Sequence, residues 1–133
     1  MLLGVGVAPA QEPALNYLQY CVGCHMQDGS GSAANNVPDM RGTIGHFVQI
    51  PQGRAFLIQV AGVAQAPIPA NELAALMNWL LPTLSANEMP AEFTPYSAAE
   101  VAQLRSLRPA DLPAMRARLI QQLSSLGYPA GDY

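Results

Sequence analysis

Two cysteines and a histidine stand close together near the start of the chain and could do chemistry as a group. Cys21 and Cys24 are the only cysteines, and His25 follows the second one directly. A Cys-x-x-Cys-His run is the attachment motif of c-type haem. Each thiol can add across one vinyl group of the porphyrin, because the two-residue gap matches the vinyl separation when the backbone turns helically. His25 would then lie beneath the iron as its proximal ligand.

Three other uses of this motif fit the sequence less well. A thiol–disulfide redox motif would need a βαβ pattern around it, whereas the segment before Cys21 has a helical pattern and no parallel-strand pattern follows. A zinc site would need four ligands, and the chain has two cysteines and two histidines without paired spacing. A disulfide across two residues would be strained. We therefore predict one haem c, covalently attached through Cys21 and Cys24.

Helices must position this motif, because no useful β-alternation occurs and the apolar residues recur with a helical period. The predicted fold class is all-α, with three to five short helices and long loops around the haem. Long loops are unusual in a small domain, but a haem supplies an apolar centre on which they can pack. The predicted helices run over 13–20, from 53 to a stop at Gly62, over 72–81 before Pro82, over 97–107, and from 111 to a stop at Gly127.

The composition and the first residues bear on partners and compartment. The formal charge is −3, and the positive side chains are six arginines, which gives no basic stripe for nucleic acid. Residues 1–10 are apolar and end in a small-x-small site at Ala8–Ala10, so we predict a signal-peptide remnant and a periplasmic protein. The alternative is a frayed apolar N-terminus on an intracellular protein. No later stretch holds about 18 uninterrupted apolar residues, so we predict no internal membrane span.

The order of these parts resembles class I cytochromes c. Tyr17 precedes the first cysteine by four residues, and the segment from Pro38 to Gly42 stands where that family has Pro-x-Leu-x-Gly. The resemblance covers residues 13–107 and implies the cytochrome c fold over 11–107, with 108–133 as a C-terminal helical extension. It also implies that the Pro38 carbonyl accepts the Nδ1–H bond of His25, which would raise the basicity of the imidazole.

The family's parts can be placed on the sequence in two ways. In the preferred alignment, residues 76–80 belong to the middle helix, Met89 lies in the axial-methionine loop, and the helix from Ser97 closes the fold. In the second alignment, 72–81 is the closing helix and Trp79 packs against Tyr17. The methionine loop would then fall near 60–69, where no methionine occurs. That absence favours the first alignment.

Met89 is therefore the predicted sixth ligand of the iron. It stands next to Pro90, with a helix starting eight residues on, so a stiffened loop could carry its sulfur to the metal. Met26 is excluded because it is adjacent to His25 and cannot reach the opposite face of the haem. The alternatives that stay open are an empty sixth position and the side chains of His46, Met40, Met77 and Met115.

Three further side chains are candidates for the haem propionates. Arg41 and Arg54 carry the fork of donors that suits a carboxylate. Trp79 could donate its indole N–H, although core packing is the more expected role for this side chain. These three residues complete the predicted cofactor-binding set, which otherwise comprises Cys21, Cys24, His25, Pro38 and Met89.

The sequence predicts an electron-transfer protein rather than an enzyme. Its partner would be a periplasmic dehydrogenase, an oxidase or another cytochrome, and the lack of lysine favours a mostly apolar docking contact. One alternative is a haem subunit of a dehydrogenase complex, with 108–133 as the interface, although that apolar stripe can equally pack on its own domain. Another is a haem enzyme or gas sensor with an open sixth site.

Overall fold

The structure is a computed structural model that describes Gly6 and residues 8–131. It is mostly helical, and the described residues form no strand, which confirms the all-α class. Most of the predicted signal-peptide remnant, residues 1–5 and 7, lies outside the described part. The elements are α1 (Pro13–Tyr20), α2 (Val22–His25), η1 (Ala33–Asn35), α3 (Ile44–Phe47), α4 (Pro51–Gln59), α5 (Ala61–Ala64), α6 (Ala70–Ser85), η2 (Ala86–Glu88), α7 (Ala98–Ser106) and α8 (Leu112–Ser125).

The helices with clear capping signals begin where the sequence predicts. The Ser97 hydroxyl accepts a hydrogen bond from the Glu100 amide at 3.1 Å, and α7 starts at the next residue. The Asp111 carboxylate accepts from the Ala114 amide at 2.9 Å in the same way for α8. Such caps satisfy N–H groups that the first helical turn leaves without partners. None of the helices in the described part of the chain combines the length and hydropathy that crossing a bilayer requires.

Helix α6 is longer than the sequence pattern predicts. Pro82 was expected to end it, but the helix continues to Ser85 with Pro82 exposed on its outer side. A proline inside a helix removes one backbone hydrogen bond and costs about 3 kcal/mol. Leu81 and Ser85, which flank the proline, are buried at 0% and 1% exposure, so tertiary packing holds the helix through this position. Short helices also occupy 33–35 and 44–47, and α4 already begins at Pro51, although residues 33–52 were expected to be largely irregular. The described part of the chain therefore has more helices than the predicted three to five.

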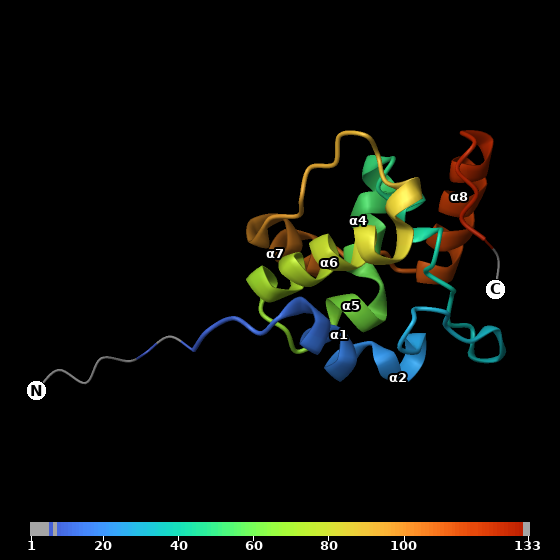
Figure 1. Cartoon of the computed structure of the whole chain (residues 1–133). Helices are drawn as coiled ribbons and strands as arrows, with labels where there is room; N and C mark the ends of the chain where they lie inside the picture. Colours follow the sequence, from blue (N-terminus) through green and yellow to red (C-terminus); the bar gives the residue numbers. More distant parts are fainter. Residues whose placement is uncertain (1–5, 7, 132–133) are drawn as a thin grey trace, which may run out of the picture.

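Helix α6 packs against α1, and this contact decides between the two alignments. The rings of Tyr17 and Trp79 lie 6.2 Å apart between their centroids, in a tilted arrangement. Helix α7 instead packs on α6 and α4, and Figure 1 shows α1 and α7 at different sides of α6. The preferred assignment of the helix from Ser97 as the one that closes onto the first helix is therefore wrong, and the packing is that of the second alignment.

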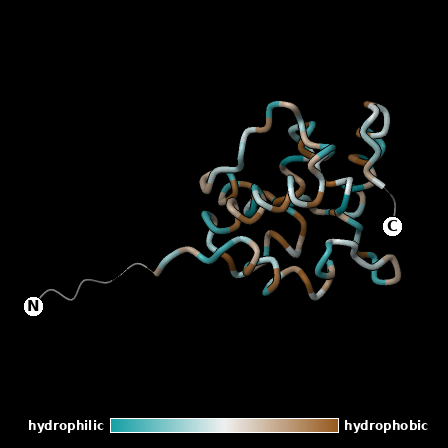
Figure 2. The backbone as a smooth tube through the Cα atoms, viewed as in Figure 1, coloured by the Kyte–Doolittle hydropathy of each residue, from teal (hydrophilic) through white to brown (hydrophobic). Residues whose placement is uncertain are grey.

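The C-terminal segment folds back onto the rest of the chain. Helix α8 packs on α3 and α4, with Leu119 and Leu123 buried at 2% and 0% exposure. Beyond the helix, the Tyr128 ring lies 5.5 Å from the ring of His46, whose Nδ1 contacts the carbonyl of Pro129. Figure 2 shows hydrophobic residues concentrated along the inner helices. The apolar stripe of α8 thus packs on its own domain, which is one of the two alternatives left open above.

Candidate haem site

The attachment motif forms one helical turn at the surface. The Cys21 carbonyl accepts hydrogen bonds from the amides of Cys24 at 3.2 Å and His25 at 2.9 Å. Cys21 is half-buried and Cys24 is exposed, and both thiols are free. The turn ends at Met26, which has a φ of 62°, and the Tyr17 hydroxyl donates to the Met26 carbonyl at 2.8 Å. Helix α1 therefore fixes the orientation of the motif through a buried tyrosine.

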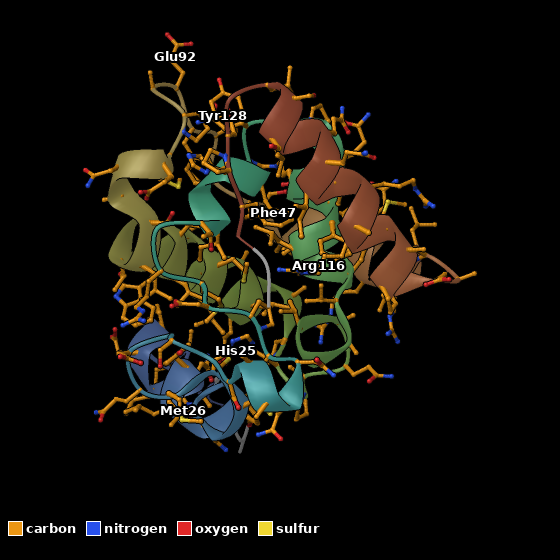
Figure 3. The ribbon with its side chains drawn as sticks, turned by 90° about the vertical axis from the view of Figure 1, so that its right-hand side faces the viewer. His25, Met26, Phe47, Glu92, Arg116 and Tyr128 are labelled. Carbon is orange, nitrogen blue, oxygen red and sulfur yellow. The ribbon has the colours of Figure 1, made fainter. Side chains whose placement is uncertain are left out.

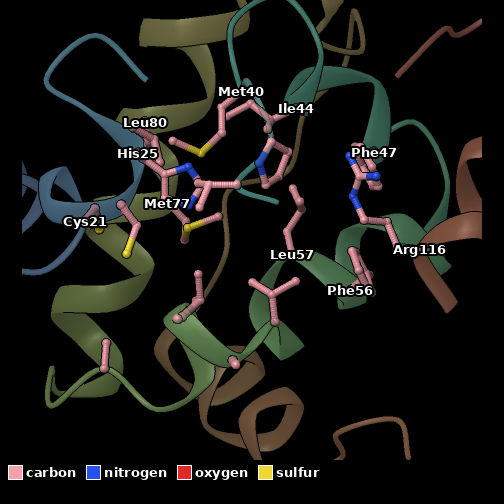
Figure 4. A pocket seen from close by; sticks show the side chains of 18 of the residues that line it. Cys21, His25, Met40, Ile44, Phe47, Phe56, Leu57, Met77, Leu80 and Arg116 are labelled. Atoms are coloured by element: carbon pink, nitrogen blue, oxygen red, sulfur yellow. The ribbon is translucent and has the colours of Figure 1, made fainter. Parts of the chain in front are cut away.

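The motif opens onto a large apolar cavity of about 540 Å³. Cys21, Cys24 and His25 line one end of it, together with Pro38 and Met40 from the segment after the motif. Most of the remaining wall is hydrocarbon (Figure 4) and comes from every α-helix in the described part of the chain except α7. A volume of this size lies within the usual range of small-molecule and cofactor sites. Its lining set includes Ile44, Phe47, Phe56, Leu57, Val60, Val63, Leu73, Leu76, Met77, Leu80, Leu112 and Arg116.

His25 holds a buried polar atom that lacks a partner. Its Nδ1 atom is inaccessible to solvent and makes no hydrogen bond with acceptable geometry. Burial lowers the pKa of His25, and the nearby carbonyl of Pro38 partly opposes this effect. A glycine at position 31 lets the Pro38 carbonyl pack closely against the loop that follows His25. Its φ of 67° suits glycine, and a Cβ atom there would collide with that carbonyl. The imidazole is thus desolvated, neutral at physiological pH, and next to the carbonyl that the sequence analysis assigned to it.

The cysteines do not have the electrostatics of a redox pair. Burial raises the pKa of the Cys21 thiol, and the neighbouring Cys24 raises it further. Thiol–disulfide exchange needs a thiolate, and reactive Cys-x-x-Cys motifs lower the pKa of the attacking cysteine. The direction found here is the opposite one. It weakens the thiol–disulfide alternative and leaves haem attachment as the better interpretation of the motif.

Arg54 does not line the cavity. Its guanidinium forms a two-pronged ion pair with Glu100, at 2.8 Å from Nε and 2.7 Å from Nη2, and donates to the Thr94 carbonyl at 2.6 Å. It also lies 4.1 Å from the centroid of the Tyr96 ring. These contacts engage Nε, Nη1 and Nη2, so the structure places Arg54 outside the cavity and pairs it with protein groups instead of leaving it for a haem propionate. The residues that Arg54 contacts lie on α7 and on the segment before α7, so this side chain connects α4 to both.

Arg41 and Trp79 also lie outside the cavity lining. Arg41 pairs with Asp39 at 2.8 Å and with Asp28 at 3.2 Å, and its side chain is 49% exposed. Its hydrogen bond lowers the pKa of the Asp39 carboxyl, whereas the pKa of the Asp28 carboxyl is lowered mainly by hydrogen bonds from Ser30 and less by Arg41. Trp79 packs against Tyr17, which is the core role that the sequence analysis considered more expected. Neither side chain is placed to bind a propionate inside the cavity.

Met89 is not brought to His25. Among the described residues, those that line the cavity do not include it. Met89 follows η2, where the Glu88 carbonyl accepts from the Gln49 side chain at 3.0 Å and Gly45 packs against Ser85 and Glu88. Because Ile44 and Phe47, on another face of α3, line the cavity, α3 stands between it and Met89. The structure therefore places Met89 outside the cavity that His25 lines.

Arg116 is the residue of this site that sequence reasoning missed. It lines the cavity from α8 and reaches inward beside Phe47 (Figures 3 and 4). One signal could have found it, because Arg116 stands four residues after Leu112 and three before Leu119, on the apolar face of that helix. The sequence analysis counted Arg116 among the six arginines and gave it no role at the site.

Comparison with known proteins adds no assignment: neither a scan against protein-family models nor a search of curated proteins finds a match to this chain. The functional argument therefore depends on the motif and on the cavity that it faces.

Proposed function

We propose that this chain is a mono-haem c-type cytochrome of the class I type that carries one electron between periplasmic proteins. One observation carries the proposal. Two free thiols and the imidazole of His25 line one end of an apolar cavity of about 540 Å³, and the buried Nδ1 atom of that imidazole has no hydrogen-bond partner. These residues fit a covalently bound haem, which supplies one-electron iron chemistry when it is present.

The chain's own residues have distinct parts in this function. Cys21 and Cys24 would hold the edge of the ring through thioether bonds, and His25 would bind the iron. The Pro38 carbonyl lies near the unpaired Nδ1 atom and would accept its N–H bond, which would orient the imidazole and strengthen it as a donor. The hydrocarbon wall excludes water from the ring, and burial of this kind is one of the factors that set the reduction potential.

The propionates would lie at the end of the cavity opposite the thiols. Arg116 and Thr43 line the cavity together with Ala130, away from the helix that carries the motif. A guanidinium suits a carboxylate because its planar fork can donate two parallel hydrogen bonds. We assign Arg116 to this role in place of Arg41 and Arg54, whose side chains are engaged in ion pairs outside the cavity.

Electrons would pass through the exposed edge beside Cys24. The two helices of this region expose large apolar side chains, since Leu18 on α1 is 50% exposed and Met26, directly after α2, is 42% exposed. Transient redox contacts are small, and an apolar surface with few charges supports brief docking that depends little on salt. A partner rate that falls steeply with ionic strength would contradict this part of the proposal.

The mass of the mature protein tests the proposal directly. Expressed in a host that matures c-type cytochromes, the chain should gain the mass of one haem, which denaturing extraction does not remove. The Cys21→Ser, Cys24→Ser double variant should lose it. Met26→Asn is the matched control, because it changes an exposed neighbour at a positive φ that asparagine tolerates. A wild-type mass equal to the bare polypeptide would end this proposal.

A further inference from the structure

We propose that the iron's sixth position is open in this protein and binds a small uncharged diatomic molecule. The inference rests on the proposed haem attachment and specifies what the same site does beyond passing electrons. It follows from the side chains on the cavity wall that faces the motif. That wall consists of hydrocarbon side chains and has no donor atom that could bind the iron.

The facing wall consists of the end of α4, α5 and the segment that leads to α6. Helix α5 packs on α4, and both helices line the cavity whose other end holds His25 of α2. None of the residues that form this wall has a nitrogen, oxygen or sulfur atom in its side chain. They are Phe56, Leu57, Val60, Ala61, Gly62, Val63, Ala66 and Ile68. In the second alignment, the axial methionine would fall in this segment. The contact between α1 and α6 is the one that this alignment predicts.

Other donors lie too far away or are engaged elsewhere. Met89 lies beyond α3, as described above. His46 holds the Pro129 carbonyl with Nδ1 and stacks on Tyr128. Met115 is outside the cavity lining, and its sulfur lies 4.0 Å from Nη2 of Arg118. None of these side chains faces His25 across the cavity.

Met40 and Met77 line the cavity but belong to the same side as His25. The Met40 amide donates to the Gly29 carbonyl at 3.0 Å, which ties it to the loop that leaves the motif. Met77 comes from α6, the helix that packs on α1. In Figure 4 both sulfur atoms lie toward the His25 end, and Leu57 lies between that group and Phe56. An axial ligand must approach the face of the ring opposite the proximal imidazole, so neither methionine is placed for it.

The character of the wall selects the ligand. A bound anion or a polarised dioxygen needs a hydrogen-bond donor beside it, and the facing wall provides none. A diatomic such as carbon monoxide or nitric oxide donates an electron pair to ferrous iron, and no group leaves. The same lack of polar groups argues against a peroxidase-like reaction, which needs donors to polarise the bound oxygen.

Spectroscopy of the holoprotein tests this inference. The ferric protein should be high-spin and lack the long-wavelength band that a thioether ligand gives. The ferrous protein should bind carbon monoxide in the time of mixing, at one molecule per haem. The Met40→Leu, Met77→Leu double variant should give the same spectra. If that double variant converts a low-spin ferric haem to a high-spin one, a native methionine is the ligand and the inference is wrong.

A methionine placed on the facing wall is the complementary test. Among Val60→Met, Val63→Met and Ala66→Met, at least one should create the thioether band and slow carbon monoxide binding at least tenfold. Val63→Leu is the matched control, since it adds bulk without sulfur. A holoprotein that carries haem yet refuses carbon monoxide would overturn the open site and leave the proposed function intact. A chain that never acquires haem would remove the proposed function itself.

Discussion

Replacing Arg54 by methionine tests whether this side chain stabilises the fold or serves the cofactor. The change removes the ion pair to Glu100, the bond to the Thr94 carbonyl and the contact with Tyr96. Hydrogen bonds to charged groups contribute about 1.5–3 kcal/mol, and a cation–π contact contributes about 0.5–1 kcal/mol. The paired side chains are 19% and 32% exposed, so solvent screens part of this. We expect a loss of about 2–3 kcal/mol at pH 7.

Urea unfolding at several pH values measures this loss. For a slope of about 1–3 kcal/mol per molar urea, the midpoint should fall by about 0.7–3 M at pH 7. Arg54 holds the pKa of the Glu100 carboxyl below its usual value. The pair's contribution is therefore complete above the unfolded-state pKa, about 4.3, and is lost as the pH falls through the lower folded-state pKa. The gap between wild type and variant should close in acid.

The exposed Arg108 supplies the control for this experiment. It makes one long contact, 3.3 Å from its Nε to the Gln59 carbonyl, so Arg108→Met should stay within about 0.5 kcal/mol of wild type. If Arg54→Met behaved like Arg108→Met in urea and instead shifted the haem potential, the assignment of Arg54 to the fold would be refuted.

Three further outcomes follow from the packing and the cavity. Arg116→Met should lower the midpoint potential of the holoprotein, because it removes a positive charge that favours the ferrous state, and Arg41→Met should not; voltammetry that finds equal shifts contradicts the propionate assignment. Leu123→Ala should cost about 2–5 kcal/mol in urea unfolding, and a loss below 1 kcal/mol would show that α8 is not firmly packed. Gly53→Ala should destabilise by about 1–3 kcal/mol, because its Cβ would collide with the Phe47 carbonyl, whereas Gly23→Ala, with open space around it, should cost less.

The parts of the site that the sequence predicted correctly are those joined by short stretches of backbone. Cys21, Cys24 and His25 share one helical turn, so their spacing fixes their relative positions before any tertiary contact forms. Pro38 reaches the same cavity because a glycine at position 31 lets the two short segments meet. Local signals also placed α1, α7 and α8, whose starts are marked by a proline or by a capping side chain.

The parts that were missed depend on partners far along the chain. Arg54 and Glu100 are separated by 46 residues, and nothing in either local sequence states that α4 and α7 will lie together. An arginine is equally suited to a propionate and to a protein carboxylate. The packing of α7 on α4 decided between them. Arg116 shows the reverse case, because the folding back of α8 brings into the cavity a side chain for which the local sequence indicated no role.

The displacement of Met89 and the wrong end of α6 have the same cause. Had the helix stopped before Pro82, the residues up to Met89 would form a loop long enough to swing a sulfur toward the cavity. Instead α6 continues to Ser85, whose buried hydroxyl accepts from the Gly45 amide at 2.9 Å and donates to the Glu88 carboxylate at 2.9 Å. These bonds fasten η2 to α3 on the side away from the cavity. Because tertiary packing continues α6 past Pro82, Met89 lies away from the cavity, and hydrocarbon side chains face His25 instead.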